Sequence, residues 1–289
     1  MFHRIPALQT RQETSQAHVA TAVMARLRGE WSRPDWRSPT LPAVGRRIVE
    51  IAQGRRWTAE EAAGLLRLDP MFAAQILRRA AGRARVRTLR QAVAVLGPDG
   101  MRTELLEFAA SLRIIQSRRT ASAIGALHRS GWRRAEAARA VCRYTTIDTE
   151  LTATAALMAD MGLVAGLIAG CDAPGQLTPP SLDEVWGPVY GGHEAIGCFL
   201  AEAWGLPEEL SLVIGSHHEV HMGGVVHPVV AALTLADAIL NDLGLGLQVE
   251  RFGTDEAVSP NACRTALKAL GMSPSQLRLA REYTRSRLM

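Results

Sequence analysis

Three histidines between residues 192 and 218 are the side chains best able to do chemistry in this chain. His193 stands near the head of the stretch GHEAIGCFLAEAWGLPEELSLVIGSHH, and His217 and His218 end it. Imidazole nitrogens are common ligands of transition metals, and a bound metal can generate hydroxide for hydrolysis. The stretch predicts two helices around a Gly-Leu-Pro break, so the first question is whether these helices hold a metal centre.

Other catalytic motifs are absent from the sequence. His218-Glu219 is followed by His221, whereas the zinc protease motif His-Glu-x-x-His needs its histidines four residues apart. There is no glycine-rich nucleotide motif and no serine in a nucleophile elbow. The cysteines form no Cys-x-x-Cys pair, which argues against a zinc knuckle or a disulfide framework and favours a reducing cytoplasm; they are Cys142, Cys171, Cys198 and Cys263.

The net charge of +5 is compatible with an anionic partner. One cluster of arginines could grip phosphate: Arg78, Arg79, Arg83, Arg85, Arg87 and Arg90. We favour a solvated helix end and loop for this cluster and keep an anion or nucleic-acid patch as the alternative. No uncharged apolar run reaches the roughly 20 residues of a membrane span, and no secretory signal begins the sequence. We therefore expect no membrane partner.

Helical periodicity extends over nearly all of the chain, and β-branched runs are rare, so the expected fold class is all-α. We expect a linker at 32–42 and a loop at 170–188. The predicted helices cover 14–29, a segment from 42, 58–68, a segment from 70, 88–97, 98–117, 121–143, 148–169, 189–203, 207–219, 226–243, 260–270 and 274–287. The expected helix starts are a capping box from Thr58 to Glu61, Asp69-Pro70, Thr88, Asp148 and Ser273-Pro274.

The predicted elements divide the chain into four parts. Residues 1–37 hold a first helix and linker, 38–118 a subdomain of short helices, 119–245 a bundle of longer helices, and 246–289 a C-terminal helical extension. The polar, basic segment 117–122 marks the central boundary. Trp31, Trp36 and Trp57 cluster near the linker, where they favour a partner surface over packing of the first helix.

Several motifs in a fixed order resemble the HDOD family, regulatory relatives of HD and HD-GYP phosphohydrolases. They are Leu41-Pro42 at the start, LDPMFAAQILR over 68–78, LRQAVAVLG over 89–97, Trp132-Arg133-Arg134, LMADMGL over 157–163, the 192–218 stretch and Ala236-Asp237. Each motif is weak alone, but their order and spacing carry the resemblance over residues 38–245. It implies an HD-like multi-helix bundle with an N-terminal subdomain.

The resemblance also implies a degenerate metal site. Where HD hydrolases carry two ligand histidines, this chain has Arg134 and Ala159, and Leu163 replaces a frequent lysine. Alanine cannot ligate a metal, and a guanidinium repels cations. The remaining candidates are Asp160, His193, His217, His218 and Asp237. We expect these, with Arg134, to form a vestigial polar cluster with no catalytic residue and no metal; a divalent transition metal at the five candidates is the alternative.

The sequence thus predicts a bacterial-type, cytoplasmic, non-catalytic HDOD regulator that binds a signalling protein or a small ligand. Family members accompany receiver, GGDEF, EAL and kinase modules, and the sequence shows none of these. We therefore expect action in trans with a two-component or cyclic-dinucleotide pathway. Two alternatives stay open: a residual metal-dependent phosphohydrolase of nucleotides or cyclic dinucleotides, and a regulator that binds nucleic acid through the arginine cluster.

Overall fold

The computed structural model describes residues 18–33, 36–53, 58–171, 179–222, 224–249, 252–253 and 257–289. Within these ranges the fold is helical, with two short antiparallel hairpins, so the all-α prediction is confirmed. A helix over 18–26 runs into the π-helix η1 (Leu27–Trp31). The remaining helices are α2 (Pro42–Gln53), α3 (Ala59–Leu68), α4 (Pro70–Ala81), α5 (Leu89–Ala110), α6 (Arg118–Cys142), α7 (Thr149–Met158), α8 (Met161–Cys171), α9 (Leu182–Ala203), α10 (Glu208–Ile214), α11 (Pro228–Asp242), α12 (Pro260–Leu270) and α13 (Pro274–Leu288). The hairpins pair β1 (His221–Met222) with β2 (Val225–Val226) and β3 (Gln248–Val249) with β4 (Phe252–Gly253).

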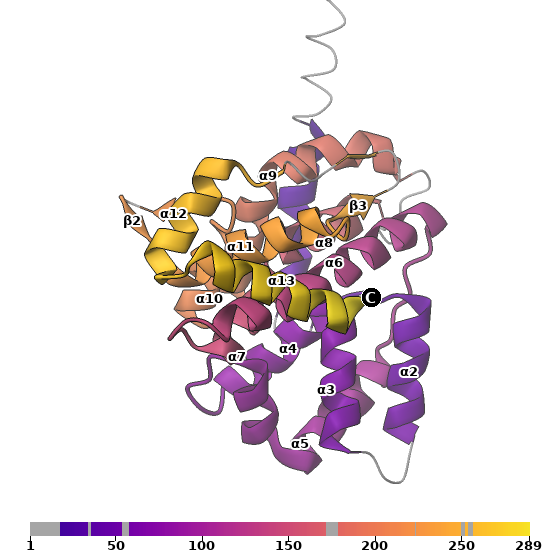
Figure 1. Cartoon of the computed structure of the whole chain (residues 1–289). Coiled ribbons are helices and arrows are strands. Elements are labelled where there is room, and N and C mark those ends of the chain that lie inside the picture. The colour runs from indigo at the N-terminus through magenta and orange to yellow at the C-terminus, as the bar shows by residue number, and fades with distance from the viewer. Residues whose placement is uncertain are drawn as a thin grey trace, which may run out of the picture.

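The helices form two groups that share one core. In Figure 1, α2, α3 and α5 form the lower part of the molecule, and the later helices lie above them. The last helix, α13, crosses the front of the bundle and packs on α6 and α11. Buried apolar side chains from Val23 to Ala280 belong to one continuous cluster. The proposed boundary near 118 therefore separates groups of helices without interrupting the core.

Local capping begins most helices where the sequence predicts them. The Thr58 and Glu61 side chains form a reciprocal capping box at α3. The Asp69 carboxylate accepts from the backbone N–H groups of Met71 and Phe72, with Pro70 at the first helical position of α4. The predicted caps at residues 88, 148 and 273 are likewise confirmed at α5, α7 and α13. These contacts satisfy N–H groups that have no partner inside the helix.

Two predicted boundaries were wrong near the middle of the chain. The helix expected to reach 117 ends at Ala110, because Thr40 of the predicted linker forms a β-bridge with Ile114. The predicted helix end at Gly97 is confirmed, because Gly97 (φ 65°) has a non-helical backbone that separates the two helical segments of α5, and glycine tolerates this positive φ. The loop expected over 170–188 is also too long, because Ser181 and Glu184 form a capping box that starts α9.

The apolar segment 149–171 is the centre of the bundle. It is long and apolar enough to cross a membrane, yet its most apolar window is wholly buried inside the protein. A single helix was predicted over 148–169, but Ala159 and Asp160 separate α7 from α8. The prediction missed this break because neither residue is a helix breaker. The break places Asp160 among polar partners from three other elements.

The expectation of a tryptophan partner surface was wrong for the two tryptophans that the structure describes. Trp31 and Trp36 are buried and stack with ring centroids 3.8 Å apart. The indole N–H of Trp204 donates to the Trp31 carbonyl at 2.7 Å. These contacts thus hold the first helix against the bundle. Trp57 lies outside the described residues.

Candidate functional site: a buried arginine, aspartate and histidine cluster

The fold brings all six residues of the predicted vestigial site together. Arg134 comes from α6 and Asp160 from the break between α7 and α8. His193 lies within α9, and His217 and His218 lie in the turn after α10. The sixth residue, Asp237, comes from α11, so five segments meet at this cluster, which we call the polar cluster. Ala159 is buried beside it and contributes no polar group.

Arg134 joins the two carboxylates of the polar cluster. Its Nη1 lies 2.6 Å from Asp160 Oδ2, and its Nε lies 2.7 Å from Asp237 Oδ1. Burial by itself would lower the pKa of Arg134, but the Asp160 and Asp237 carboxylates outweigh it and raise that pKa. Burial would likewise raise the pKa of Asp160, yet Arg134, with smaller help from the histidines, holds it well below its usual range. Arg134 and Asp160 are therefore both charged at neutral pH.

The histidines are oriented by backbone carbonyls. His193 Nδ1 donates to the Tyr190 carbonyl at 2.6 Å, and His217 Nδ1 donates to the Ile214 carbonyl at 3.1 Å. A neutral ring that donates from Nδ1 carries only a lone pair at Nε2. These two Nε2 atoms lie 3.3 Å apart, and His217 Nε2 is also 3.3 Å from Asp160 Oδ1. A shared proton or cation would link these three closely spaced atoms.

His218 completes a possible donor set for a metal. Its Nε2 lies 3.3 Å from His193 Nε2. Four donor atoms, one each from Asp160, His193, His217 and His218, lie within 4.8 Å of one another. Tetrahedral zinc with bonds of about 2.0–2.1 Å places neighbouring ligand atoms about 3.3 Å apart. The Asp160 oxygen that faces the histidines is not the one that Arg134 holds, so these residues fit a single transition metal, whereas Asp237 lies outside the set.

Glu194 is a member of the site that sequence reasoning missed. Its Oε1 accepts from the His218 backbone N–H at 3.0 Å and lies 3.6 Å from His217 Nδ1. The glutamate therefore fixes the turn that presents both histidines. Its position directly after His193 was a signal that could have been used. A cavity of about 420 Å³ opens in front of the polar cluster and is also lined by Tyr190, Thr234 and Asn241.

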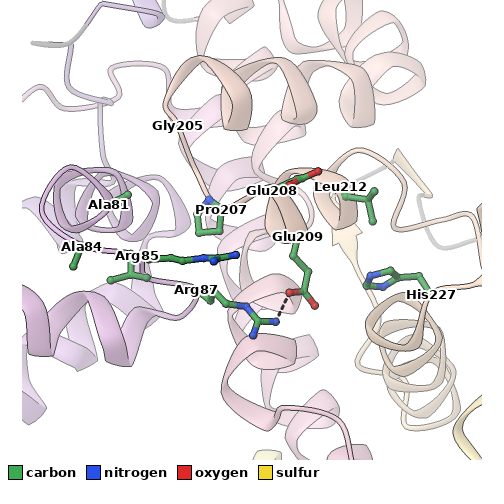
Figure 2. A pocket seen from close by; sticks show the side chains of 11 residues that line it. Ala81, Ala84, Arg85, Arg87, Gly205, Pro207, Glu208, Glu209, Leu212 and His227 are labelled. Atoms are coloured by element: carbon green, nitrogen blue, oxygen red, sulfur yellow. Dashed lines mark hydrogen bonds and ion pairs between the residues drawn. The ribbon is translucent and has the colours of Figure 1, made fainter.

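The six clustered arginines of the sequence line three separate cavities. Figure 2 shows Arg85 and Arg87 in a cavity of about 520 Å³, where Arg87 pairs with Glu209 of α10. Arg79 pairs with Glu104 at 3.1 Å and with Glu107 at 2.6 Å. Arg78, Arg79 and Arg83 line a second cavity, and Arg90 lines a third. Two of the six arginines are thus already neutralised by glutamates.

Another buried histidine, His128 of α6, lies outside the polar cluster. Neither of its ring nitrogens has a hydrogen-bond partner of normal geometry within the described residues. Burial lowers the pKa of His128, with only partial opposition from Asp69. Burial also lowers the pKa of His193, against the opposing effect of Asp160. Both rings are neutral in the folded protein at neutral pH.

We expect the unfolding free energy to fall as the pH drops below about 6.5, the ordinary histidine pKa. In this window the unfolded chain binds protons that the folded chain excludes, at up to about 1.4 kcal/mol per pH unit for each histidine. His128→Leu should flatten the curve, because leucine fills the site without a titrating group. Urea unfolding between pH 5 and pH 8 measures this, with exposed His18→Leu as the control. Parallel curves for parent and His128→Leu would contradict the prediction.

The chain matches a known family in sequence and known structures in fold. Residues 38–220, more than half of the chain, match the model of the HDOD domain. The MmoQ response regulator from Methylococcus capsulatus str. Bath has a similar structure, with TM-score 0.59 and 22% identity, over 84% of this chain and 97% of that one. A fragment of the same protein gives TM-score 0.56 and 21% identity, over 83% and 93%. At these identities the likeness shows the fold alone. No curated protein matches the sequence.

Proposed function

The chain belongs to the HDOD domain family, and we propose that it is a non-catalytic regulator that signals by binding a protein or a small ligand. The similar fold of a response regulator supports a signalling role. Action in trans, in a two-component or cyclic-dinucleotide pathway of the bacterial cytoplasm, is the setting that we propose.

The observation that carries the proposal is the Arg134 guanidinium between Asp160 and Asp237. A hydrolytic metal centre needs carboxylates that are free to bind the ion and an open coordination position for water. Here a permanent positive charge occupies one oxygen of each carboxylate. We infer that Arg134 supplies the charge that a hydrolytic metal would otherwise supply, so the bundle keeps its shape without the chemistry.

The four clustered donor atoms favour a second candidate, a structural metal. One ion held by Asp160, His193, His217 and His218 would bind the His193 and His217 Nε2 atoms, which lie 3.3 Å apart. Four protein ligands would leave no open position, which is typical of structural rather than catalytic zinc. Such an ion would stabilise the fold and is compatible with a regulatory role.

We expect the parent protein to show no hydrolysis of bis(p-nitrophenyl) phosphate above the protein-free control, with or without added Mn²⁺ or Zn²⁺. The double variant R134H/A159H should take up more metal than the parent, because it exchanges a cation and a methyl group for two ligands. Elemental analysis after dialysis measures the uptake, and Arg129→His, an exposed change on the same helix, is the control.

Each result of this experiment separates the candidates. Metal-dependent turnover by the parent would overturn the non-catalytic proposal. About one ion per parent chain without turnover would establish the structural metal. No increase of metal in the double variant, with its helical circular dichroism intact, would refute the idea that Arg134 replaces a metal's charge.

A further inference from the structure

A separate cavity of about 580 Å³ lies where the two groups of helices meet the C-terminal helix. Its walls come from α3, α5, α6, α7 and α13, and we call it the junction cavity. Its volume falls within the range of about 300–1,000 Å³ that is usual for small-molecule sites. Because α13 lies beyond the residues that match the family model, one wall is contributed by the extension of this chain.

Part of the lining of the junction cavity is apolar and aromatic. Trp132 of α6 is half-buried there, beside the buried side chains of Leu66 and Leu157. Tyr283 of α13 also lines the cavity. An indole face next to aliphatic side chains favours a flat, apolar ring in the cavity.

The charges that line the junction cavity are unbalanced. Four arginines and two glutamates contribute to it. Arg139 pairs with Glu150 and lies 3.9 Å from Glu136, and Arg287 lies 3.6 Å from the same Glu136. Both glutamates are thus already paired with arginines. Arg67 and Arg90 are exposed, and neither guanidinium has an ion-pair or hydrogen-bond partner within the part of the chain that the structure describes.

We propose that the junction cavity binds a planar aromatic ring that carries a phosphate monoester. The ring packs on Trp132, and the dianionic phosphate sits between the two surplus guanidinium groups of Arg67 and Arg90, which offer forked donors for its oxygens. The two surplus positive charges match the two negative charges of the phosphate. The bound molecule would contact α6 on the side away from Arg134, and the proposal holds whether or not the polar cluster takes a metal.

Isothermal titration of the full chain with adenosine 5′-monophosphate tests the proposal at pH 7.5 and low salt. We expect binding that the double variant R67A/R90A weakens at least tenfold, because it loses two charge-assisted contacts. The double variant R46A/R102A removes the same charge from exposed arginines outside the cavity and should bind like the parent. Trp132→Leu, which retains an apolar filler, should also weaken binding.

Adenosine and inorganic phosphate separate the two halves of the ligand. Each should bind at least tenfold more weakly than the monophosphate, since each keeps only one set of contacts. Equal losses in both arginine double variants would overturn the proposal and indicate attraction by net charge alone. So would phosphate binding as tight as that of the monophosphate, or no detectable binding of the monophosphate at millimolar concentration.

Discussion

Replacing Arg134 with methionine is expected to lower the unfolding free energy by about 3–5 kcal/mol. The guanidinium is buried and balances Asp160 and Asp237, so its removal leaves the buried Asp160 carboxylate and the partly exposed Asp237 carboxylate without their shared positive charge. Leaving one member of a buried ion pair without its partner costs more than the pair itself contributes. Urea unfolding at pH 7 measures the loss.

Two further variants make this result specific to the charge network. Arg129→Met makes the same change at an exposed site on α6 and should alter stability by less than about 0.5 kcal/mol. The triple variant R134M/D160N/D237N removes the uncompensated charges along with the arginine, so it should recover a large part of the loss. A loss below about 1 kcal/mol for Arg134→Met would show that the network contributes little.

Gly162→Ala is expected to destabilise the fold by about 3 kcal/mol or more, at the upper end for overpacking. A Cβ at Gly162 of α8 would lie 2.0 Å from the His193 carbonyl oxygen and 2.5 Å from the Gly197 backbone nitrogen of α9. Both are backbone atoms of α9, so neither can move away by the rotation of a side chain. The two helices must move apart, which also alters the 3.9 Å separation of Asp160 Oδ1 and His193 Nε2. Urea unfolding gives the stability.

Gly191→Ala is the matched control, because it makes the same change in α9 at a position where a Cβ meets nothing within 4 Å. Alanine is favoured over glycine inside a helix by about 0.5–1 kcal/mol, so this variant should be slightly more stable than the parent. If Gly162→Ala were as stable as Gly191→Ala, the close approach of α8 and α9 would be refuted.

The sequence predicted the elements whose ends are set by neighbouring residues. The capping box of Thr58 and Glu61 and the Asp69-Pro70 start of α4 depend on hydrogen bonds within three residues, so the pattern of residues reveals them. The helix start at Ser181 follows the same rule and was missed because prolines and glycine upstream favoured a loop. The order of the short motifs likewise indicated the HDOD family, which the match of residues 38–220 confirms.

The arrangement of the polar groups in the site depends on the tertiary structure. Arg134 reaches Asp160 across 26 positions of sequence and Asp237 across 103, and no local pattern fixes such distances. The residue types predicted a vestigial cluster, but only packing could direct the guanidinium to both carboxylates and turn the histidine Nε2 atoms toward one another. Trp31 and Trp36 illustrate the same division, because their types fitted a partner surface and the fold buried them. Helix capping depends on residues within one helical turn, so the sequence reveals it. The polar cluster depends on how five separate segments pack in the folded bundle, so only the tertiary structure determines it.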